Sequence, residues 1–422
     1  MRILVLTINY WPEQTGIGAV VTRRCEYLAS LGHEVTVCTA MPYYPEWRID
    51  PNYRGKWFHH EERKGVNILR SWIWVPKRVT SAKRILFEAS FLASSLLRAL
   101  GCRKPELLLV VSPPLGLAIS ARILSRWLGA QYVFDVEDLQ PDAAADLGML
   151  PRPVLPVLYR LEALAYNRAA AITTVTDGMR QKIVAKGIPA DRITVVPPPA
   201  DNALFEVGNA SQGEAFRRKY GLGDEFVVAH SGNMGVKQGL DLVLDVASEL
   251  TRHREIAFLL TGDGAMKRHL ESRAKSLRLG NVRFLPLQEK TEFLQMLAAT
   301  DLALIVQQSC VSDIAFPSKM VTLLSAARPI AASVSQDSEV ARVLSRSKGG
   351  VVTEPGRADA LAESIVQLLN DPERRSMMGE CGRRYAQQHW DEDLVLPALE
   401  SLFLKVVGEP ESATLAGNSA PA

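Results

Sequence analysis

The sequence predicts an α/β protein of two Rossmann-like, doubly wound parallel-sheet domains that face a cleft. Short apolar runs typical of buried strands alternate with amphipathic helical segments from residue 2 to residue 196. The same alternation restarts at residue 226, beyond three consecutive prolines at 197–199 and a polar stretch that ends near residue 212. With 422 residues, the chain is also too long for one ordinary core.

The proline-rich stretch sets the expected domain boundaries. An N-terminal domain is predicted at residues 1–200 and a C-terminal domain at residues 201–390. A helix predicted over 391–407 follows, and we expect it to pack back toward the N-terminal domain. The remaining residues, 408–422, are small and polar with proline and glycine among them, which predicts a disordered tail.

The first half opens as strand, helix and strand, the start of a parallel sheet. The predicted strands cover 2–7, 34–40, 67–75, 106–111, 131–136, 171–175 and 193–196. The predicted helices cover 20–31, 81–100, 115–128, 154–168 and 177–185, and residues 42–64 are expected to be irregular. A ligand-facing glycine loop with Gly16 and Gly18 follows the first strand. It lacks a third glycine and comes late after the strand, so a dinucleotide site is weakly supported.

The second half repeats the pattern. Its predicted strands cover 226–229, 256–261, 282–285, 302–306, 329–333 and 350–352. Its predicted helices include 265–279, 291–299, 319–326, 337–344, 358–369 and 373–388. A further helix begins after Gly239, with Leu240, Val243, Leu244 and Ala247 on one face.

Composition argues against several classes of protein. Hydrophobic residues make up 47% and charged residues 23%, as in soluble globular domains, and a net charge of +3 is too small to indicate a nucleic-acid partner. Five scattered cysteines without CxxC spacing argue against a disulfide framework or zinc site and fit a reducing cytosol. The opening apolar run is too short for a signal peptide. The longest apolar helix candidate, 85–97, is shorter than the roughly 20 residues of a membrane span, so none is predicted.

Residues 47–104 are basic and aromatic. Between Arg48 and Lys104 stand thirteen Lys and Arg residues against four Asp and Glu residues. Basic residues interleaved with aromatic ones are typical of a surface for nucleic acid, a membrane or an anionic lipid head group. The alternative interpretation is a solvated charged face combined with tryptophans that belong to the core.

The loop after the strand 226–229 has the features of an anion site. The strand breaks at Gly232, continues through Asn233, places Lys237, and leads into a helix after Gly239. Glycines allow backbone N–H groups to approach an oxyanion, the helix start adds positive potential, and lysine adds a full charge. The alternative is an ordinary strand-to-helix turn whose lysine is solvated.

Three more segments supply candidate residues. Gly262 follows a buried strand, where a missing side chain lets a base or ribose approach the backbone. Ser318 and Lys319 stand at a predicted helix start, a second cradle for an anion. Asp138 is a catalytic candidate in the acidic loop at the end of the strand 131–136, where α/β proteins keep ligand chemistry, although acidic helix caps have the same appearance. The acidic residues of this loop are Asp135, Glu137, Asp138 and Asp142.

Taken in order, these segments resemble the motifs of retaining GT-B glycosyltransferases of family 4. That family carries G-x-x-x-x-K-G, then P-S-K…L-A-x-G-x-P, then P-G-x-x-x-A-L…D-P…R…M-G-x-x-G-R. The matching segments here begin at Gly232, Pro317 and Pro355. Segments 11–18 and 135–142 are similar to the branch that makes O-antigen and colanic-acid-type polysaccharides, and the resemblance covers residues 1–404.

The resemblance implies a role for each matched residue. The loop with Gly16 and Gly18 would cap the diphosphate of a nucleotide-sugar donor from the N-terminal, acceptor-binding domain. Lys237 would neutralise that diphosphate as it leaves, Ser318 and its neighbours would contact sugar and phosphate, and Glu339 would bind near hydroxyl groups of ribose or sugar. Such enzymes act without a metal or other cofactor, and no Asp-x-Asp ligand pair is evident here.

The chain departs from the family pattern at two places. Asn233 stands where the family often has an arginine, and the loop is shorter. The paired glutamates that precede the alanine-rich helix are missing, since residues 314 and 322 are Ile and Thr. Asp313 is the nearby acid and is taken as their catalytic substitute.

The leading hypothesis is a retaining, metal-independent glycosyltransferase of cell-surface polysaccharide biosynthesis. It would be cytoplasmic and would associate peripherally with the inner face of the plasma membrane through residues 47–104. The donor would be a UDP-, GDP- or TDP-sugar, and the acceptor a saccharide on a polyprenyl diphosphate. The alternatives are a nucleotide-sugar epimerase of the same architecture and a non-catalytic nucleotide-sugar-binding paralogue.

Overall fold

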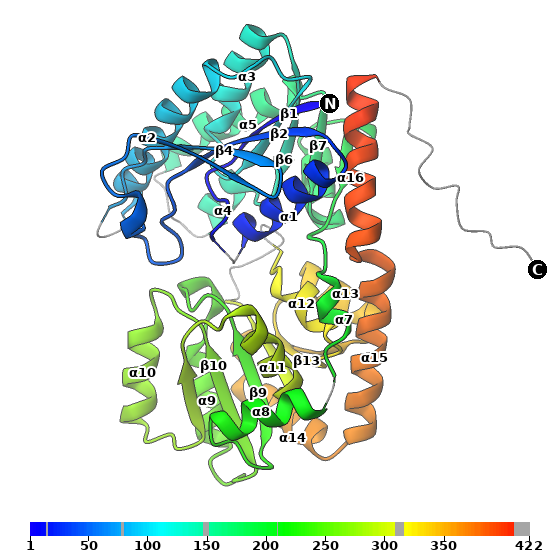
Figure 1. The fold of residues 1–422 in the computed structure, drawn as a ribbon. Coiled ribbons are helices and arrows are strands. Elements are labelled where there is room, and N and C mark those ends of the chain that lie inside the picture. Colours follow the sequence, from blue (N-terminus) through cyan, green and yellow to red (C-terminus); the bar gives the residue numbers. More distant parts are fainter. Residues whose placement is uncertain (14–15, 77–79, 147–151, 209, 309–315, 409–422) are drawn as a thin grey trace, which may run out of the picture. The chain divides into compact units, whose positions relative to one another are not determined.

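The computed structural model describes residues 1–13, 16–76, 80–146, 152–208, 210–308 and 316–408 (Figure 1). The chain divides into two compact units. Unit 1 holds the residues up to Pro141, the segment that ends at Pro197 and the residues from Asp393 onward. Unit 2 holds Pro198–Glu392 and a short segment that begins at Asp142. Residues 409–422, the predicted tail, lie outside the described residues.

Unit 1 is built on an eight-stranded sheet in the order β3-β4-β2-β1-β5-β6-β7-β8. Its strands are β1 (Arg2–Leu6), β2 (Glu34–Ala40), β3 (Phe58–Arg63), β4 (Val66–Ser71), β5 (Leu107–Ser112), β6 (Gln131–Val136), β7 (Ala171–Thr174) and β8 (Ile193–Val195). All neighbours are parallel except β3 and β4. The central strands are fully buried because helices cover both faces of a parallel sheet.

Strand β3 corrects the expectation that residues 42–64 are irregular. It pairs antiparallel with β4, and Lys64 and Gly65 between them adopt positive φ angles of 46° and 76°. This is the backbone of a tight hairpin turn whose twist matches that of the flanking strands. The strand escapes detection because it lies at the edge of the sheet and no side chain in it is fully buried.

Helices cover the two faces of the unit 1 sheet. They are α1 (Ile17–Ser30), α2 (Ser81–Leu100), α3 (Leu117–Leu128), α5 (Leu155–Arg168), α6 (Asp177–Ala185) and α16 (Glu392–Val407), and α4 (Gln140–Asp146) follows β6. Short 3-10 turns lie at η1 (Pro51–Tyr53), η2 (Arg152–Val154) and η3 (Ala190–Arg192). Figure 1 shows α1 and α16 on one side of this sheet and α2 and α3 on the other.

The last helix belongs to the core of unit 1. Val395, Leu399 and Phe403 of α16 are buried in one cluster with Ile3 and Val5 of β1. A hydrogen bond of 2.8 Å between His33 Nε2 and a Glu400 carboxylate oxygen joins the same helix to the loop before β2. The apolar spacing in α16 therefore reflects packing against the first strand of the chain.

Unit 2 is built on a six-stranded, fully parallel sheet in the order β11-β10-β9-β12-β13-β14. Its strands are β9 (Phe226–Ser231), β10 (Ile256–Thr261), β11 (Val282–Leu285), β12 (Leu302–Val306), β13 (Ile330–Ser333) and β14 (Gly350–Thr353). Together with the unit 1 sheet, it confirms the prediction of two doubly wound parallel sheets.

Helices again cover both faces in unit 2. They are α7 (Asn202–Phe205), α8 (Ala210–Lys219), α9 (Asp241–Glu249), α10 (Lys267–Ser276), α11 (Lys290–Ala299), α12 (Lys319–Ser325), α13 (Glu339–Ser347), α14 (Ala358–Leu369) and α15 (Pro372–His389), with a 3-10 turn η4 (Val236–Gln238). Alternate residues of β9 enter opposite cores: Val227 and Ala229 lie in one buried cluster, Phe226 and Val228 in the other. Leu240, Val243, Leu244 and Ala247 are buried, as their spacing predicts.

Within the described ranges, none of the helices is both long and apolar enough to cross a membrane.

Candidate active site

The topology of unit 2 points to one position on its sheet. The chain builds β9, β10 and β11 toward one edge, and then returns to place β12 on the other side of β9. At such a switch point the loops that follow the two strands diverge and leave a crevice at their carboxyl ends, where α/β proteins bind ligands. The two loops here begin at Gly232 and Gln307, and they meet in a 3.0 Å hydrogen bond from Gln308 N to the Lys237 carbonyl.

Three glycines let the turns after β9 and β10 lie directly against each other. Gly232 (φ 118°) donates its N–H to the Thr261 carbonyl at 2.9 Å. Gly262 (φ 141°) has no room for a side chain, since a Cβ there would lie 1.9 Å from the Gly232 carbonyl oxygen. A Cβ on Gly264 would lie 2.6 Å from both the Met234 carbonyl and the Asn233 amide oxygen. The site therefore presents close-packed backbone rather than side chains.

Lys319 directs its ammonium group at this glycine turn. It is the first residue of α12, directly after Ser318 at the helix cap, and its Nζ lies 3.9 Å from the position that a Cβ on Gly232 would occupy. Burial lowers the pKa of Lys319 to about 8. No hydrogen bond or ion pair to Nζ is formed by any residue in the described part of the chain. A partly buried cation without a partner among the described residues, beside a turn that carries no side chain at Gly232 or Gly262, is an arrangement that an anion would complete.

His230 lies directly beneath the same turn. It is the penultimate residue of β9 and is fully buried. Burial, with a smaller contribution from the charge on Lys319, holds the pKa of His230 well below its usual value, so the imidazole is neutral. It adds no charge that would compete with Lys319 for an anion.

Lys237 and Glu339 occupy different settings. Lys237 is partly exposed in η4, where its backbone rather than its side chain ties the two switch-point loops together. Glu339 begins α13 after the cap residue Ser338, and its carboxylate accepts hydrogen bonds from Arg342 at 2.7 and 3.1 Å. An acceptor group already bound to a guanidinium is less available to ligand hydroxyl groups.

In unit 1, the glycine loop after β1 encloses a buried carboxylate that sequence reasoning missed. Glu13 accepts hydrogen bonds from Asn9 Nδ2 at 2.7 Å and from the backbone N–H groups of Tyr43 and Tyr44 at 3.3 and 3.1 Å. A Cβ on Gly18 would lie 3.2 Å from the Glu13 side chain. Burial raises the pKa of Glu13 to about 7. The carboxyl group thus fixes the loop after β1 to the loop after β2.

The acidic loop after β6 is partly structural. Arg24, buried in α1, donates from Nη1 to Asp135 at 2.8 Å and to Glu137 at 2.7 Å. Thr173 donates to the second oxygen of Asp135 at 2.6 Å, and burial raises the pKa of Glu137 to about 8. Asp138, the predicted catalytic acid, follows directly and is half-buried. Two of the four acidic residues of the predicted loop therefore serve to hold one buried arginine.

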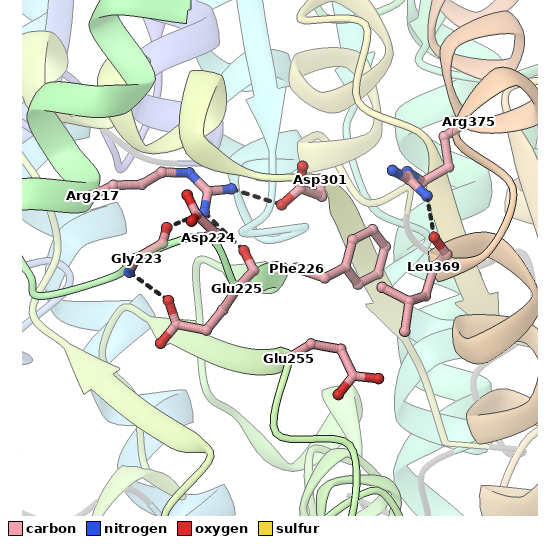
Figure 2. Close-up of a pocket in the computed structure, with 9 residues that line it drawn as sticks. All are labelled: Arg217, Gly223, Asp224, Glu225, Phe226, Glu255, Asp301, Leu369 and Arg375. Carbon is pink, nitrogen blue, oxygen red and sulfur yellow. Dashed lines mark hydrogen bonds and ion pairs between the residues drawn. The ribbon is translucent and has the colours of Figure 1, made fainter.

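Figure 2 shows a hollow of about 330 Å³ at the opposite, amino end of the unit 2 sheet. Arg217 points across it to Asp301, with an ion pair of 2.7 Å, and also donates to the carbonyls of Gly223 and Glu225. Because this guanidinium is already paired, and parallel sheets bind ligands at their carboxyl ends, we assign the hollow no ligand.

Comparisons with known proteins identify the family. Residues 15–199 match the model of the glycosyl transferase 4-like domain, and residues 212–385 match that of glycosyl transferases group 1. The putative colanic acid biosynthesis glycosyl transferase WcaI of Escherichia coli K12 is 31% identical over 404 residues, which cover 94% of this chain and 98% of that protein. The chain is a GT-B glycosyltransferase of family 4.

More distant relatives agree with this assignment. The probable glycosyltransferase WbjE of Pseudomonas aeruginosa is 25% identical over 322 residues, or 73% of this chain and 76% of that protein. The structure of HepE from Anabaena in complex with UDP is similar in fold, with a TM-score of 0.73 and 16% identity, and covers 96% of this chain and all of that one. Sucrose-phosphate synthase from Thermosynechococcus elongatus has a TM-score of 0.77 at 16% identity, with 97% and 99% of the two chains covered.

The glycosyltransferase brings some of the predicted site residues together. Gly232, Asn233, Gly262 and Lys319 lie within one cluster of contacts, and Lys237 is joined to it through Gln308. Ser318 precedes Lys319 at the helix cap, whereas no contact links Glu339 to this cluster among the described residues. Gly16, Gly18 and Asp138 belong to unit 1, and Asp313 lies outside the described residues.

Among the described residues of the glycosyltransferase, no group of three His, Cys, Asp or Glu side chains is placed to hold a metal ion.

The residue roles given by the resemblance remain predictions. The structure adds Glu13 and Arg24, two buried residues that hold the loops after β1 and β6 in place.

Proposed function

We propose that this glycosyltransferase moves a sugar from a nucleotide diphosphate donor to a saccharide carried on a polyprenyl diphosphate, in cell-surface polysaccharide biosynthesis. The observation that carries the proposal is the partly buried ammonium group of Lys319 beside the glycine turn of Gly232 and Gly262. It offers one full positive charge beside a turn without bulky side chains at the switch point, which suits the diphosphate of such a donor.

The chemistry follows from where charge develops. When the bond between the anomeric carbon and the diphosphate oxygen breaks, negative charge builds up on the departing nucleotide diphosphate. A cation fixed in a low-dielectric site stabilises that charge more in the transition state than in the ground state. In this proposal Lys319 and Lys237 perform that role, Ser318 and Asn233 contact phosphate and sugar, and no metal ion is required. Retention of the anomeric configuration is proposed from the family resemblance.

Unit 1 would bind the acceptor. The loop with Gly16 and Gly18 is expected to cap the donor diphosphate, and Asp138 is expected to act at the reacting hydroxyl group. Glu13 holds that loop in place through its hydrogen bonds to Asn9, Tyr43 and Tyr44. We regard Glu13 as a positioning residue, because its carboxylate is already engaged with protein donors.

The acceptor class is proposed from the relatives. WcaI bears a name from colanic acid biosynthesis, and the structure of HepE contains UDP. A lipid-linked acceptor would place the enzyme at the inner face of the cytoplasmic membrane. The sequence predicts that the basic region 47–104 contacts that membrane. The donor would be a UDP-, GDP- or TDP-sugar.

Donor binding is the first test. Thermal denaturation would be followed with UDP-, GDP- and TDP-sugars, because a ligand that binds the folded state at 100 times its Kd stabilises it by about 2.7 kcal/mol. We expect one nucleotide class to raise Tm for the wild type and for Lys275→Met, an exposed control, but not for Lys319→Met. If none of the sugar nucleotides raised the Tm of the wild type, the proposal would be wrong.

Turnover separates the alternatives. Release of free nucleotide only when a lipid-linked acceptor is added would support transfer. Conversion of the donor sugar without acceptor would instead indicate an epimerase, and tight binding without any turnover would indicate a non-catalytic nucleotide-sugar-binding protein.

A further inference from the structure

Unit 1 exposes an apolar surface that the proposed reaction does not use. Half of the large apolar side chains that are exposed in the described structure lie on the three helices α2, α3 and α5. The most exposed are Trp127 (72%) on α3 and Leu97 (67%) on α2. We define the apolar helical face by six side chains: Leu86, Leu97, Ile119, Ile123, Trp127 and Val157.

The three helices form one continuous surface. Helix α3 contacts α2 on one side and α5 on the other. Helix α2 packs on β2 and β4, and α3 packs on β5 and β6, so the helices follow the order of the strands beneath them (Figure 1). The six apolar side chains therefore belong to a single face of unit 1.

Helical spacing shows that these side chains point away from the core. On α3, Ile119, Ile123 and Trp127 are spaced four residues apart and are exposed, whereas Leu124 and Leu128 on the same helix are buried. On α2, Leu86 and Leu97 are exposed, whereas Phe87 and Phe91 are buried. Helix α3 thus carries a second apolar stripe in addition to the one that it needs for its own fold, and α2 adds exposed apolar side chains beside it.

The three helices are predominantly basic. The three helices carry two acidic residues, and both are engaged: Glu88 pairs with Arg84 at 3.2 Å, and Glu162 is buried against Lys186 at 2.8 Å. On α3, Arg122 and Arg126 are exposed between the apolar positions. The basic residues of the three helices are Lys83, Arg84, Arg98, Arg122, Arg126, Arg160 and Arg168.

The surface extends over all three helices. Helix α2 has 20 residues and is therefore about 30 Å long, and packed neighbours lie roughly 8–10 Å apart. The three helices together cover a surface on the order of 600 Å², apolar and basic side chains included. Its exposed apolar side chains, gathered on adjacent helices and interleaved with arginines, are typical of an interaction surface.

The structure does not favour the region 47–104 as a whole for this contact. Arg70 is buried and pairs with Glu61, and Tyr53 is also buried. Trp57 and Phe58 are exposed aromatic residues near them, and the Trp57 ring packs at a tilt of 32° against Trp72, with 5.0 Å between ring centroids. Within residues 47–104, only helix α2 belongs to the apolar helical face. Helices α3 and α5 follow later in the sequence.

We propose that the apolar helical face docks on an anionic lipid bilayer, an inference that rests on the lipid-linked acceptor of the proposed function. Trp and Tyr favour the boundary between head groups and acyl chains, where Ile and Leu enter the apolar layer. The arginines lay their aliphatic stems along that layer while their guanidinium groups reach lipid phosphates.

Charge argues against a second copy of the chain as the partner. In a two-fold dimer formed through this face, Arg122 and Arg126 of one copy would approach the same basic surface of the other. Like charges brought together in this way oppose association. The two glutamates of the three helices are already paired with Arg84 and Lys186, so they do not offset this repulsion. A bilayer supplies diffuse negative charge without such a constraint.

Vesicle flotation tests the proposal. Full-length protein would be mixed with phosphatidylcholine vesicles with and without 30 mol% phosphatidylglycerol. We expect binding to the anionic vesicles, and at least a roughly 25-fold loss of partitioning for the double variant Arg122→Glu/Arg126→Glu, since each basic residue near the surface contributes roughly five-fold. The double variant Arg252→Glu/Arg254→Glu, with the same charge change on unit 2, should bind like the wild type.

A second measurement tests the apolar contribution. Brominated lipid should quench tryptophan emission of the wild type and quench Trp127→Phe much less, while Trp127→Glu should not bind. Equal binding of the wild type and the α3 variants, or no binding to anionic vesicles, would overturn the proposal. So would a dimer in solution that Trp127→Glu dissociates, because the face would then be a protein interface.

Donor binding distinguishes this proposal from the proposed function. The donor-induced rise in Tm is measured without vesicles, and the α3 variants should retain it in full. A protein that binds vesicles but no sugar nucleotide would refute the proposed function and leave the docking surface standing.

Discussion

The variant Lys319→Met separates the binding role of this lysine from its effect on stability. Methionine has a similar length without the charge, and it suits a partly apolar setting. The fall in the pKa of Lys319 from 10.5 to about 8 means that the folded state disfavours the ammonium form. At about 1.4 kcal/mol per pKa unit, that preference corresponds to about 3 kcal/mol. We therefore expect the variant to be more stable than the wild type at pH 7, by up to about 3 kcal/mol.

Binding should change in the opposite direction. Two unit charges 4 Å apart interact by about 4 kcal/mol at an effective dielectric constant of 20. Loss of the ammonium group should therefore weaken donor binding by more than 100-fold, although the fold gains stability. Isothermal titration with the donor class found by thermal shift measures the loss, and chemical denaturation measures the gain.

The pH dependence gives an independent check. Between pH 8 and 10.5 the unfolded chain keeps the proton on Lys319 while the folded chain has released it, so the free energy of unfolding rises with pH. The unfolding free energy of Lys319→Met should lack this rise with pH. Subtracting the two pH profiles therefore removes the contribution of all other titrating groups. Donor affinity of the wild type should fall about tenfold per pH unit above 8, because the anion binds the protonated form.

Two results would refute this reasoning. If Lys319→Met were less stable than the wild type by more than about 1 kcal/mol, the ammonium group would be a paired structural element. If the variant bound the donor like the exposed control Lys275→Met, the diphosphate would bind elsewhere.

Three further predictions concern other parts of the molecule. Gly262→Ala should lower stability by about 3 kcal/mol and abolish the donor-induced rise in Tm, because its Cβ would meet the Gly232 carbonyl at 1.9 Å; Gly280→Ala, which has open space around it, should do neither. Lys237→Ala should reduce turnover far more than stability, and nearly intact activity would show that this lysine has no role in transfer. Arg24→Met should lower the free energy of unfolding by about 3–5 kcal/mol in urea titrations at pH 8, because Asp135 and Glu137 lose the buried guanidinium that donates to both. That loss should be smaller at pH 5 than at pH 8, since protonation relieves the unpaired charge.

Most of the fold was predictable because its strands are buried on both faces and therefore appear as continuous apolar runs. Strand β3 was not, because an edge strand with partly exposed side chains lacks that signal. Its only mark in the sequence is Lys64-Gly65, a dipeptide suited to a hairpin turn.

The candidate site was predictable where local sequence determines it. Gly232, Gly262 and Lys319 stand directly after strands or at a helix start, and the parallel topology brings such positions together. Glu13 and Arg24 were not predictable, since their roles depend on partners far along the chain. Arg24 and Asp135 are 111 residues apart in sequence, and a charged residue in an amphipathic helix ordinarily faces water.

The return of α16 to unit 1 has a consequence for how the protein is made. During synthesis, β1 through β8 emerge from the ribosome long before Val395, Leu399 and Phe403 do, and these three residues fill the same core as Ile3 and Val5. Until then the nascent sheet has an open apolar side that a chaperone could cover. Unit 2 has all of its strands and helices by Glu392. The unit that is translated first is thus the one whose core is completed last.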